Sequence, residues 1–286
     1  MLSWSDDTRR PSRRMVLRAG SAGLATSLVG NAVCGPASVA TADPRVADIV
    51  RAGTLRVGLG LGVLTQAIKN PVTGELRGAA LEIARALAAR IGVRLVTVEF
   101  PRPGATLEGL RTNAWDLAFN VVDPARKGQV DFSHDFWLSD LTYLVAPGSP
   151  VRNVADADQP GVRIAVPRGD GSDLYLSRML KRAELVRTES HAAAVDLLRT
   201  GGADAKASPR YVLMTEAQGL PGSRVLDEGF ADISYAAMVP KGQVARLAYI
   251  NEFVEDAKAS GAVKRIIDSL GLQGARVAPP EKSGLR

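Results

Sequence analysis

The sequence predicts an α/β fold made of two similar units with a ligand cleft between them. Short runs of aliphatic and β-branched residues alternate with segments whose apolar residues recur at helical spacing, which is typical of a parallel sheet covered by helices. The alternation restarts after a stretch, 147–161, that contains Pro147, Pro150, Pro160 and Gly161. Each unit has about 100 residues. Parallel sheets bind ligands in crevices at the carboxyl ends of their strands, so the cleft is expected there.

The first unit is expected to contain three strands and two helices. The strands are predicted over 54–58, 94–100 and 116–121. A helix is predicted over 79–91, where Leu81, Ile83, Ala84, Leu87 and Ile91 recur at helical spacing. A short helix containing Leu107 and Leu110 precedes the third strand.

The second unit repeats this order. Strands are predicted over 162–166, 185–188 and 203–207, and helices over 169–182 and 191–200. A further strand at 235–239 is followed by two amphipathic helices, one carrying Val244, Leu247, Ile250 and Val254 and the other Val263, Ile266, Ile267 and Leu270. The tail 273–286 contains Pro279, Pro280 and Gly284 and is expected to be disordered.

Composition excludes several classes of protein. Of 286 residues, 46% are hydrophobic and 23% charged, which does not fit a disordered chain. The formal net charge is +6, and half of it falls in residues 1–42, which hold five Arg and two Asp. The remaining basic residues do not cluster, so no nucleic-acid partner is expected.

The first 42 residues resemble an export signal. Arg13-Arg14 precedes a mildly apolar, glycine-rich run, and small residues follow at 40–42, as in twin-arginine signals. Cleavage is predicted after Ala42, or else after Ala40, with delivery to the periplasm. The single cysteine, Cys34, could carry a lipid anchor, but Val33 before it fits such a site poorly, so this alternative is less favoured.

No catalytic motif or metal site is predicted. The glycines of Gly58–Gly62 lack the third glycine of a dinucleotide site, because Val63 stands there, and a glycine-rich loop at the cleft mouth is the better interpretation. The mature chain has His134 and His191 but no cysteine, so a zinc site of usual composition is not expected. We predict a chain without cofactor, metal or catalytic residue, and His191 is expected to be solvated or to cap a helix.

Two segments could bind an anion. Arg126 follows the third strand of the first unit, where its planar guanidinium could hold a carboxylate through two hydrogen bonds. Gly169–Ser172 lies between a strand and a helix, where free N–H groups attract anions. Asp170 could instead cap that helix, so a ligand role and a capping role are both open.

The order of these segments resembles the family 3 bacterial extracellular solute-binding proteins, the polar amino-acid receptors of ABC importers. The resemblance covers about Leu55 to Leu272 and rests on several short segments taken together. These are Thr54–Gly58, Gly78–Ala84, Trp115–Ala118, Pro124–Arg126, Val130–Ser133, Val162–Gly169 and Tyr235–Gly242.

The resemblance implies a type II periplasmic binding protein with two lobes joined by two hinge crossings. The crossings would lie near Leu138–Leu141 and Ile233–Ala237, with the first lobe at 43–138 and 237–272 and the second at 139–236. Arg126 falls on the arginine that holds the ligand carboxylate in this family. Gly169, Asp170, Gly171 and Ser172 fall on the carboxylate-binding turn of the second lobe.

Three departures from the family change the expected contacts. The segment before Arg126 is about two residues short by alignment to the family, so Asn120 or Asp123 would supply polar contacts instead. The first loop lacks the usual aromatic residues and offers Thr65 and Gln66. The family's aspartate for the ligand amino group would fall near Ser208 or Pro209, where no acid stands. The ligand is therefore expected to be an organic acid, or an amino acid that is held differently.

We predict a monomeric periplasmic receptor, not an enzyme, that delivers a small carboxylate-bearing solute to an inner-membrane ABC permease by hinge closure. Two alternatives remain open at this stage. One is a sensor or interaction module whose pocket has decayed. The other is an enzyme similar to the periplasmic cyclohexadienyl dehydratases, for which Glu75 and Glu82 are the available acids.

Overall fold

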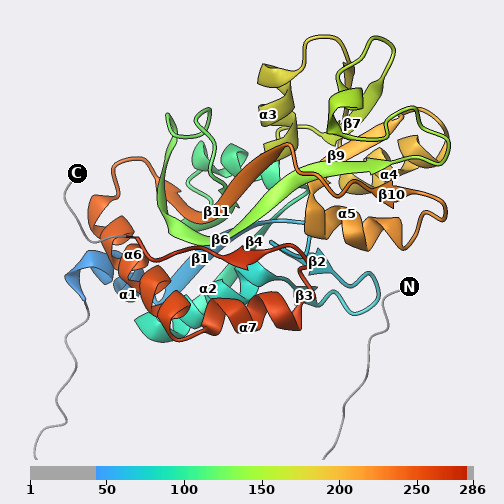
Figure 1. Cartoon of the computed structure of the whole chain (residues 1–286). Helices are drawn as coiled ribbons and strands as arrows, with labels where there is room; N and C mark the ends of the chain where they lie inside the picture. The colour runs from blue at the N-terminus through green and yellow to red at the C-terminus, as the bar shows by residue number, and fades with distance from the viewer. Residues whose placement is uncertain (1–42, 282–286) are drawn as a thin grey trace, which may run out of the picture. The chain divides into compact units, whose positions relative to one another are not determined.

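A mixed sheet of ten strands runs through the computed structural model, which describes residues 43–281 (Figure 1). Eight strands follow the order β4-β1-β5-β11-β6-β9-β7-β8, while β10 and β12 pair with β6 beside this path. The first lobe is the β4-β1-β5 end of this sheet with its helices, and the second lobe is the β9-β7-β8 end. This arrangement confirms the predicted α/β class.

Most of the first lobe comes from the chain before residue 122. Its elements are the short 3-10 helices η1 (Pro44–Val46) and η2 (Pro103–Leu110), the helices α1 (Ala47–Ala52) and α2 (Ala79–Ile91), and the strands β1 (Thr54–Gly60), β2 (Ile68–Lys69), β3 (Leu76–Arg77), β4 (Arg94–Phe100) and β5 (Leu117–Val121). The chain returns to this lobe in α6 (Val244–Ala259) and α7 (Ala262–Ser269).

The second lobe comes from the middle of the chain. Its elements are η3 (Val154–Ala157), β7 (Arg163–Pro167), α3 (Gly171–Met179), β8 (Glu184–Thr188), α4 (His191–Arg199), β9 (Ala205–Pro209), α5 (Arg210–Ala217) and β10 (Arg224–Val225). Strands β7, β8 and β9 are parallel to one another, as are β1, β4 and β5 in the first lobe.

Two long antiparallel strands connect the lobes. β6 (Val130–Val145) pairs with β11 (Ala231–Pro240) along 130–141 and with β9 along 141–145, so Leu141 has a partner on both sides. β11 also pairs with β5 in the first lobe. All described residues belong to one compact unit, and the lobe boundaries expected from the sequence stay predictions.

Helices cover both faces of the second lobe. Ile164 and Val166 of β7 pack in one cluster with Leu176 of α3, while Ala165 between them packs with Leu198 of α4 on the opposite face. In the first lobe, α2, α6 and α7 share one core with β1 and β5, and η2 covers Trp115 on the other face. Parallel strands buried on both faces explain why these segments are apolar without alternation.

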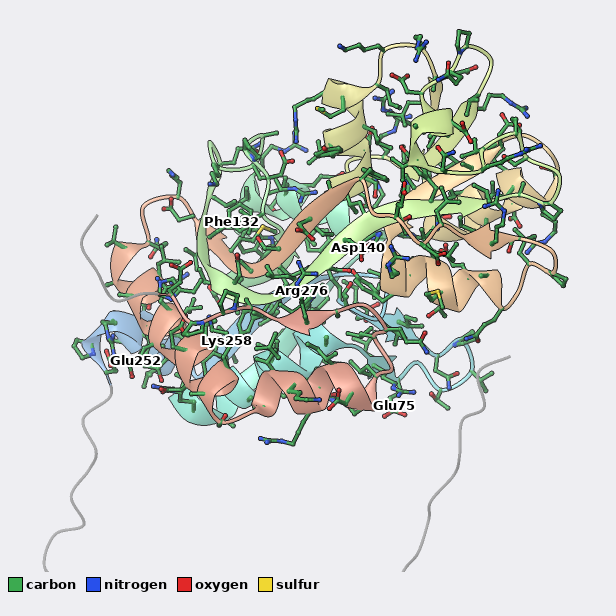
Figure 2. The ribbon with its side chains drawn as sticks, viewed as in Figure 1. Glu75, Phe132, Asp140, Glu252, Lys258 and Arg276 are labelled. Atoms are coloured by element: carbon green, nitrogen blue, oxygen red, sulfur yellow. The ribbon has the colours of Figure 1, made fainter. Side chains whose placement is uncertain are left out.

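The structure corrects two expectations. Strand β1 extends to Gly60, so Gly58 and Gly60 lie in the strand and only Gly62 lies in the loop after it. The tail is not disordered from residue 273, because β12 (Arg276–Val277) pairs with Trp137 and Leu138 of β6. Figure 2 shows Arg276 beside this strand, and its guanidinium reaches Asp232.

Helix α5 was not predicted at all. Its sequence, Arg210–Ala217, follows a proline and consists mainly of residues that are compatible with a helix, but it lacks a clear apolar stripe. None of the helices within 43–281 has the length and apolar character that spanning a membrane requires. The signal peptide, its cleavage sites and Cys34 lie outside the described residues.

We expect Gly60→Ala to destabilise the fold. A Cβ on Gly60 would lie 2.4 Å from the Cα of Pro103, so the two backbone segments would have to separate. Overpacking of this kind costs about 1–3 kcal/mol. The control is Gly128→Ala, because a Cβ there would meet nothing within 4 Å. Urea unfolding should show a lower free energy of unfolding for Gly60→Ala alone, and equal stability of both variants would contradict this packing.

Candidate functional site

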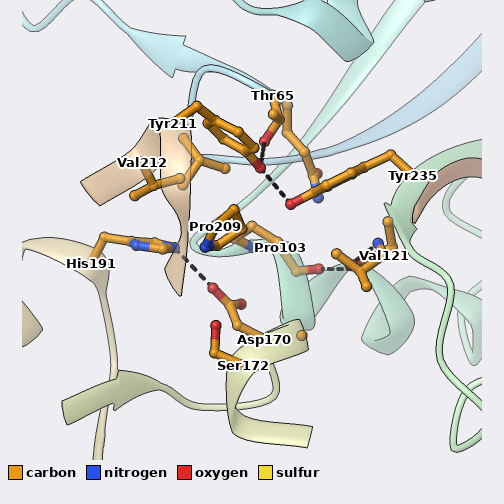
Figure 3. A pocket seen from close by; sticks show the side chains of 14 residues that line it. Thr65, Pro103, Val121, Asp170, Ser172, His191, Pro209, Tyr211, Val212 and Tyr235 are labelled. Atoms are coloured by element: carbon orange, nitrogen blue, oxygen red, sulfur yellow. Dashed lines mark hydrogen bonds and ion pairs between the residues drawn. The ribbon is translucent and has the colours of Figure 1, made fainter. Parts of the chain in front are cut away.

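A cavity lies where the carboxyl ends of the parallel strands of both lobes meet (Figure 3). It encloses about 360 Å³ not filled by atoms, part of which opens to solvent. The loop after β1, the start of η2 after β4 and the end of β5 form the first-lobe wall. The starts of α3, α4 and α5, which follow β7, β8 and β9, form the second-lobe wall, and β11 contributes Tyr235.

Six of the nine residues proposed from the sequence line this cavity. They are Thr65, Gln66, Asn120, Asp170, Gly171 and Ser172. Asn120 Nδ2 donates to the carbonyl oxygen of Pro103 at 3.0 Å, and Gln66 Oε1 accepts from the backbone N–H of Gly60 at 2.6 Å. These two amides therefore hold neighbouring backbone segments in the wall.

Arg126 lies directly behind the cavity wall and connects the lobes. It is 1% exposed. Nη1 donates to the carbonyl oxygen of Val121 at 2.7 Å in the first lobe, and Nη2 donates to that of Gly169 at 2.7 Å in the second. Nε is buried and has no hydrogen-bond partner among the described residues. Burial lowers the pKa of Arg126, opposed by the charges of Asp170 and Asp123.

Asp123 and Ser208 do not line the cavity. Asp123 lies in the first lobe and pairs with Arg178 of α3 at 2.9 Å, which makes a second contact between the lobes. Ser208 is buried in β9, where it pairs with Thr142 of β6. The structure therefore brings Arg126 and Asp123 near the cavity as bridges between the lobes.

Asp170 faces the cavity and does not cap α3. It is the residue before that helix, but its side chain makes no capping hydrogen bond. Oδ2 lies 2.8 Å from Nε2 of His191, the first residue of α4 (Figure 3). Gly171 after it needs its small size, because a Cβ there would lie 3.2 Å from the side chain of Val121 in the first lobe.

A chain of charged side chains extends from Asp170 into the second lobe. Nδ1 of His191 lies 3.2 Å from Nζ of Lys206 on β9, and Lys206 pairs with Glu216 of α5. The side chain of Lys206 is 0% exposed. His191 is also buried, and Ser190 caps its helix, so the expectation of a solvated or capping histidine is wrong.

These neighbours shift the pKa values within the chain. Burial lowers the pKa of Lys206, and Glu216 opposes the shift. Burial alone would raise the pKa of Glu216, but Lys206 and His191 outweigh it and the net pKa is lowered. For His191, burial and Lys206 lower the pKa, but Asp170 and Glu216 outweigh them and the net pKa is raised.

Two tyrosines close another side of the cavity. The hydroxyl of Tyr211 on α5 donates to Thr65 Oγ1 in the first lobe at 3.3 Å and shares a hydrogen bond with the hydroxyl of Tyr235. Burial raises the pKa of both tyrosines, so their hydroxyls are neutral donors and acceptors. Tyr235 stacks on Trp137 of β6 with ring centroids 5.3 Å apart.

Sequence reasoning missed His191, Lys206, Tyr211, Glu216 and Tyr235. A lysine within the small-residue strand 205–209 was the one available signal of a buried charge.

In the part of the chain that the structure describes, no three His, Asp or Glu side chains gather in an arrangement that could hold a metal ion.

Comparison with known proteins identifies a family. A model of the bacterial extracellular solute-binding proteins, family 3, matches residues 65–271. A glutamine-binding protein of Geobacillus stearothermophilus is 26% identical over 191 residues, which are 65% of this chain and 72% of that protein. The ABC transporter glutamine-binding protein GlnH of Bacillus subtilis (strain 168) is 25% identical over 203 residues, or 70% of this chain and 74% of that protein.

A solved structure shares the fold. The crystal structure of the ancestral amino acid-binding protein AncCDT-1, a precursor of cyclohexadienyl dehydratase, superposes with a TM-score of 0.70. Its identity to this chain is 24%, and the match covers 79% of this chain and 98% of that one. At this identity the likeness establishes the type II binding-protein fold, with its two lobes, and nothing about the ligand.

We expect His191 to make stability depend on pH. Its pKa is raised above the ordinary value of 6.5, so the protonated ring stabilises the folded state. This contribution is complete below about pH 6.5 and is lost as the pH rises through the raised pKa. As the pH rises above about 6.5, the wild type should therefore lose stability relative to His191→Gln in urea unfolding. Parallel pH profiles of the two proteins would contradict the assignment.

Proposed function

Because this chain belongs to the bacterial extracellular solute-binding proteins, family 3, we propose that it is a periplasmic receptor for an amino acid. It delivers this solute, as a monomer, to an inner-membrane ABC permease. The observation that carries the proposal is the cavity itself, because residues from the carboxyl ends of strands in both lobes line it. The glutamine-binding names of the two relatives support an amino acid as the solute.

The carboxylate of the solute binds beside Arg126 in this proposal. Three features support that position: the guanidinium is buried, it lies between the lobes, and Nε has no hydrogen-bond partner among the described residues. A guanidinium is the cation best suited to a carboxylate, because it is planar and always charged. The carboxylate would bind Nε or replace one of the two backbone carbonyls.

Hinge closure around the solute completes the proposed mechanism. Three contacts that span the lobes support it: Arg126 with Gly169, Arg178 with Asp123, and Tyr211 with Thr65. A ligand shifts the hinge equilibrium only through contacts that it makes in the closed form. A solute held by both walls of the cavity makes such contacts.

The comparisons do not favour the two alternatives, a decayed sensor module and a dehydratase-like enzyme. The two curated relatives are named as binding proteins, although the structural neighbour is described as a precursor of a dehydratase. Neither acid suggested for the enzyme lines the cavity. Glu75 is exposed on the outside of the first lobe (Figure 2), and Glu82 pairs with Arg85 on α2.

Arg126→Ala should weaken binding of the solute by about 30-fold or more, as expected when a buried charge loses its partner. Isothermal titration of purified protein with a panel of amino acids and organic acids measures this effect. Arg94→Ala, an exposed arginine on β4, serves as the control and should bind normally. Unchanged affinity of folded Arg126→Ala would remove the guanidinium from the site, and no binding by the wild type would overturn the proposed function.

Small-angle X-ray scattering tests the closure. The radius of gyration should decrease when the amino acid that binds in the titrations is added at saturation, because the ligand stabilises the closed form. A radius that is the same with and without ligand would contradict hinge closure while leaving the binding function intact.

A further inference from the structure

Asp170 is the only acidic side chain that lines the cavity among residues 43–281. It stands at the N-terminus of α3, where aligned backbone N–H groups stabilise a negative charge. Figure 3 shows its carboxylate on the second-lobe wall, bonded to His191 on one side. Any buried positive charge of a solute in this cavity has this carboxylate as its available partner.

The two oxygens of Asp170 have different surroundings. Oδ2 lies 2.8 Å from Nε2 of His191. Oδ1 is buried and has no hydrogen-bond partner among the described residues, and Asp170 as a whole is 8% exposed. A buried acceptor without a partner costs about 1–3 kcal/mol, and more when it is charged. Oδ1 is therefore a position that a hydrogen-bond donor, above all a cationic one, would stabilise.

Neighbouring residues keep this oxygen free. His191 holds Oδ2, and its other ring nitrogen lies beside the buried Lys206–Glu216 pair, so the carboxylate is fixed in orientation. Arg126 is the nearby guanidinium, but its two terminal nitrogens donate to the carbonyl oxygens of Val121 and Gly169. The third nitrogen, Nε, does not bond to Oδ1 either, so Oδ1 is open to a donor from the solute or its water.

We propose that Oδ1 of Asp170 accepts a hydrogen bond from the α-ammonium group of the bound amino acid. This inference rests on the proposed function, which makes the solute an amino acid. Asp170, at the start of α3, would then replace the acid that is missing near Ser208 and Pro209 on β9. With the carboxylate beside Arg126, the two ends of the zwitterion would meet two of the four buried side-chain polar atoms that lack partners among residues 43–281.

The same count of charges limits the side chain of the solute. A second recess adjoins the cavity through Val63, Tyr211 and Val212, and Glu216 is the one acid that lines it among the described residues. Both carboxylate oxygens of Glu216 accept hydrogen bonds from Lys206. Among residues 43–281, these recesses therefore leave no free acid for a second cation, and the solute is an amino acid without a cationic side chain.

The first test compares L-glutamine with 4-carbamoylbutanoate, which is glutamine without its amino group. By isothermal titration, the wild type should prefer L-glutamine by about 30-fold or more. In Asp170→Asn this preference should fall to a few-fold or disappear. Asp204→Asn, which removes an acid that pairs with Arg163 elsewhere in the second lobe, should keep the preference.

The outcomes separate this inference from the proposed function. A wild type that binds amino acids without preferring L-glutamine to 4-carbamoylbutanoate overturns the role of Asp170, even if Asp170→Asn does not fold. A folded Asp170→Asn that keeps the full preference overturns it too. Failure of the wild type to bind any amino acid overturns the proposed function, and this inference with it.

The second test compares L-arginine with L-citrulline, which has nearly the same shape but no charge on its side chain. The wild type should bind L-citrulline at least about 10-fold more tightly, because the guanidinium of arginine would be buried without a partner. Equal or tighter binding of L-arginine overturns the exclusion of cationic side chains. If neither compound binds while other amino acids do, a cationic amino acid that binds as tightly as the uncharged ones overturns it.

Discussion

Lys206 is a fully buried cation, and the second-lobe wall of the cavity is built around the groups that pair with it. Glu216 pairs with Nζ directly, and His191 lies between Nζ and Asp170. Removing one partner from a buried ion pair costs about 3–5 kcal/mol, so these side chains must stay together. Because they begin or belong to α3, α4, β9 and α5, their pairing fixes the starts of α3 and α4 and the last turn of α5 against one strand.

The first-lobe wall uses neutral groups where the second uses charges. Asn120, Gln66 and Thr65 bind backbone or hydroxyl groups, and these bonds position the segments around the end of β1 and the start of η2. Arg126 is the exception, since its guanidinium binds one carbonyl from each lobe. A charged wall facing a neutral wall, with an arginine between them, suits a small zwitterion better than an inorganic or organic anion.

Local periodicity was sufficient for much of the fold. Helix α2 and strand β4 have the bounds 79–91 and 94–100 that the apolar spacing predicted, because α2 buries one face and β4 pairs with β1 along its whole length. Short motifs in the correct order were sufficient to identify the family. Both kinds of information depend on residues that are near one another in the chain, and a single sequence displays them directly.

Pairing between residues that are far apart in the chain could not be predicted from the sequence. From the sequence alone, Lys206 would be taken for an exposed lysine. In the structure, β9 places it against His191 and Glu216, which are 15 and 10 residues away in the chain. Helix α5 and strand β12 are stabilised by packing on the sheet more than by their own composition, so neither was predicted. Local periodicity and motif order thus specified the α/β architecture and the family, and they made Arg126 a candidate for the site. Only the tertiary structure decided which charged groups surround the cavity, because the state of a buried charge depends on the partners that packing brings to it.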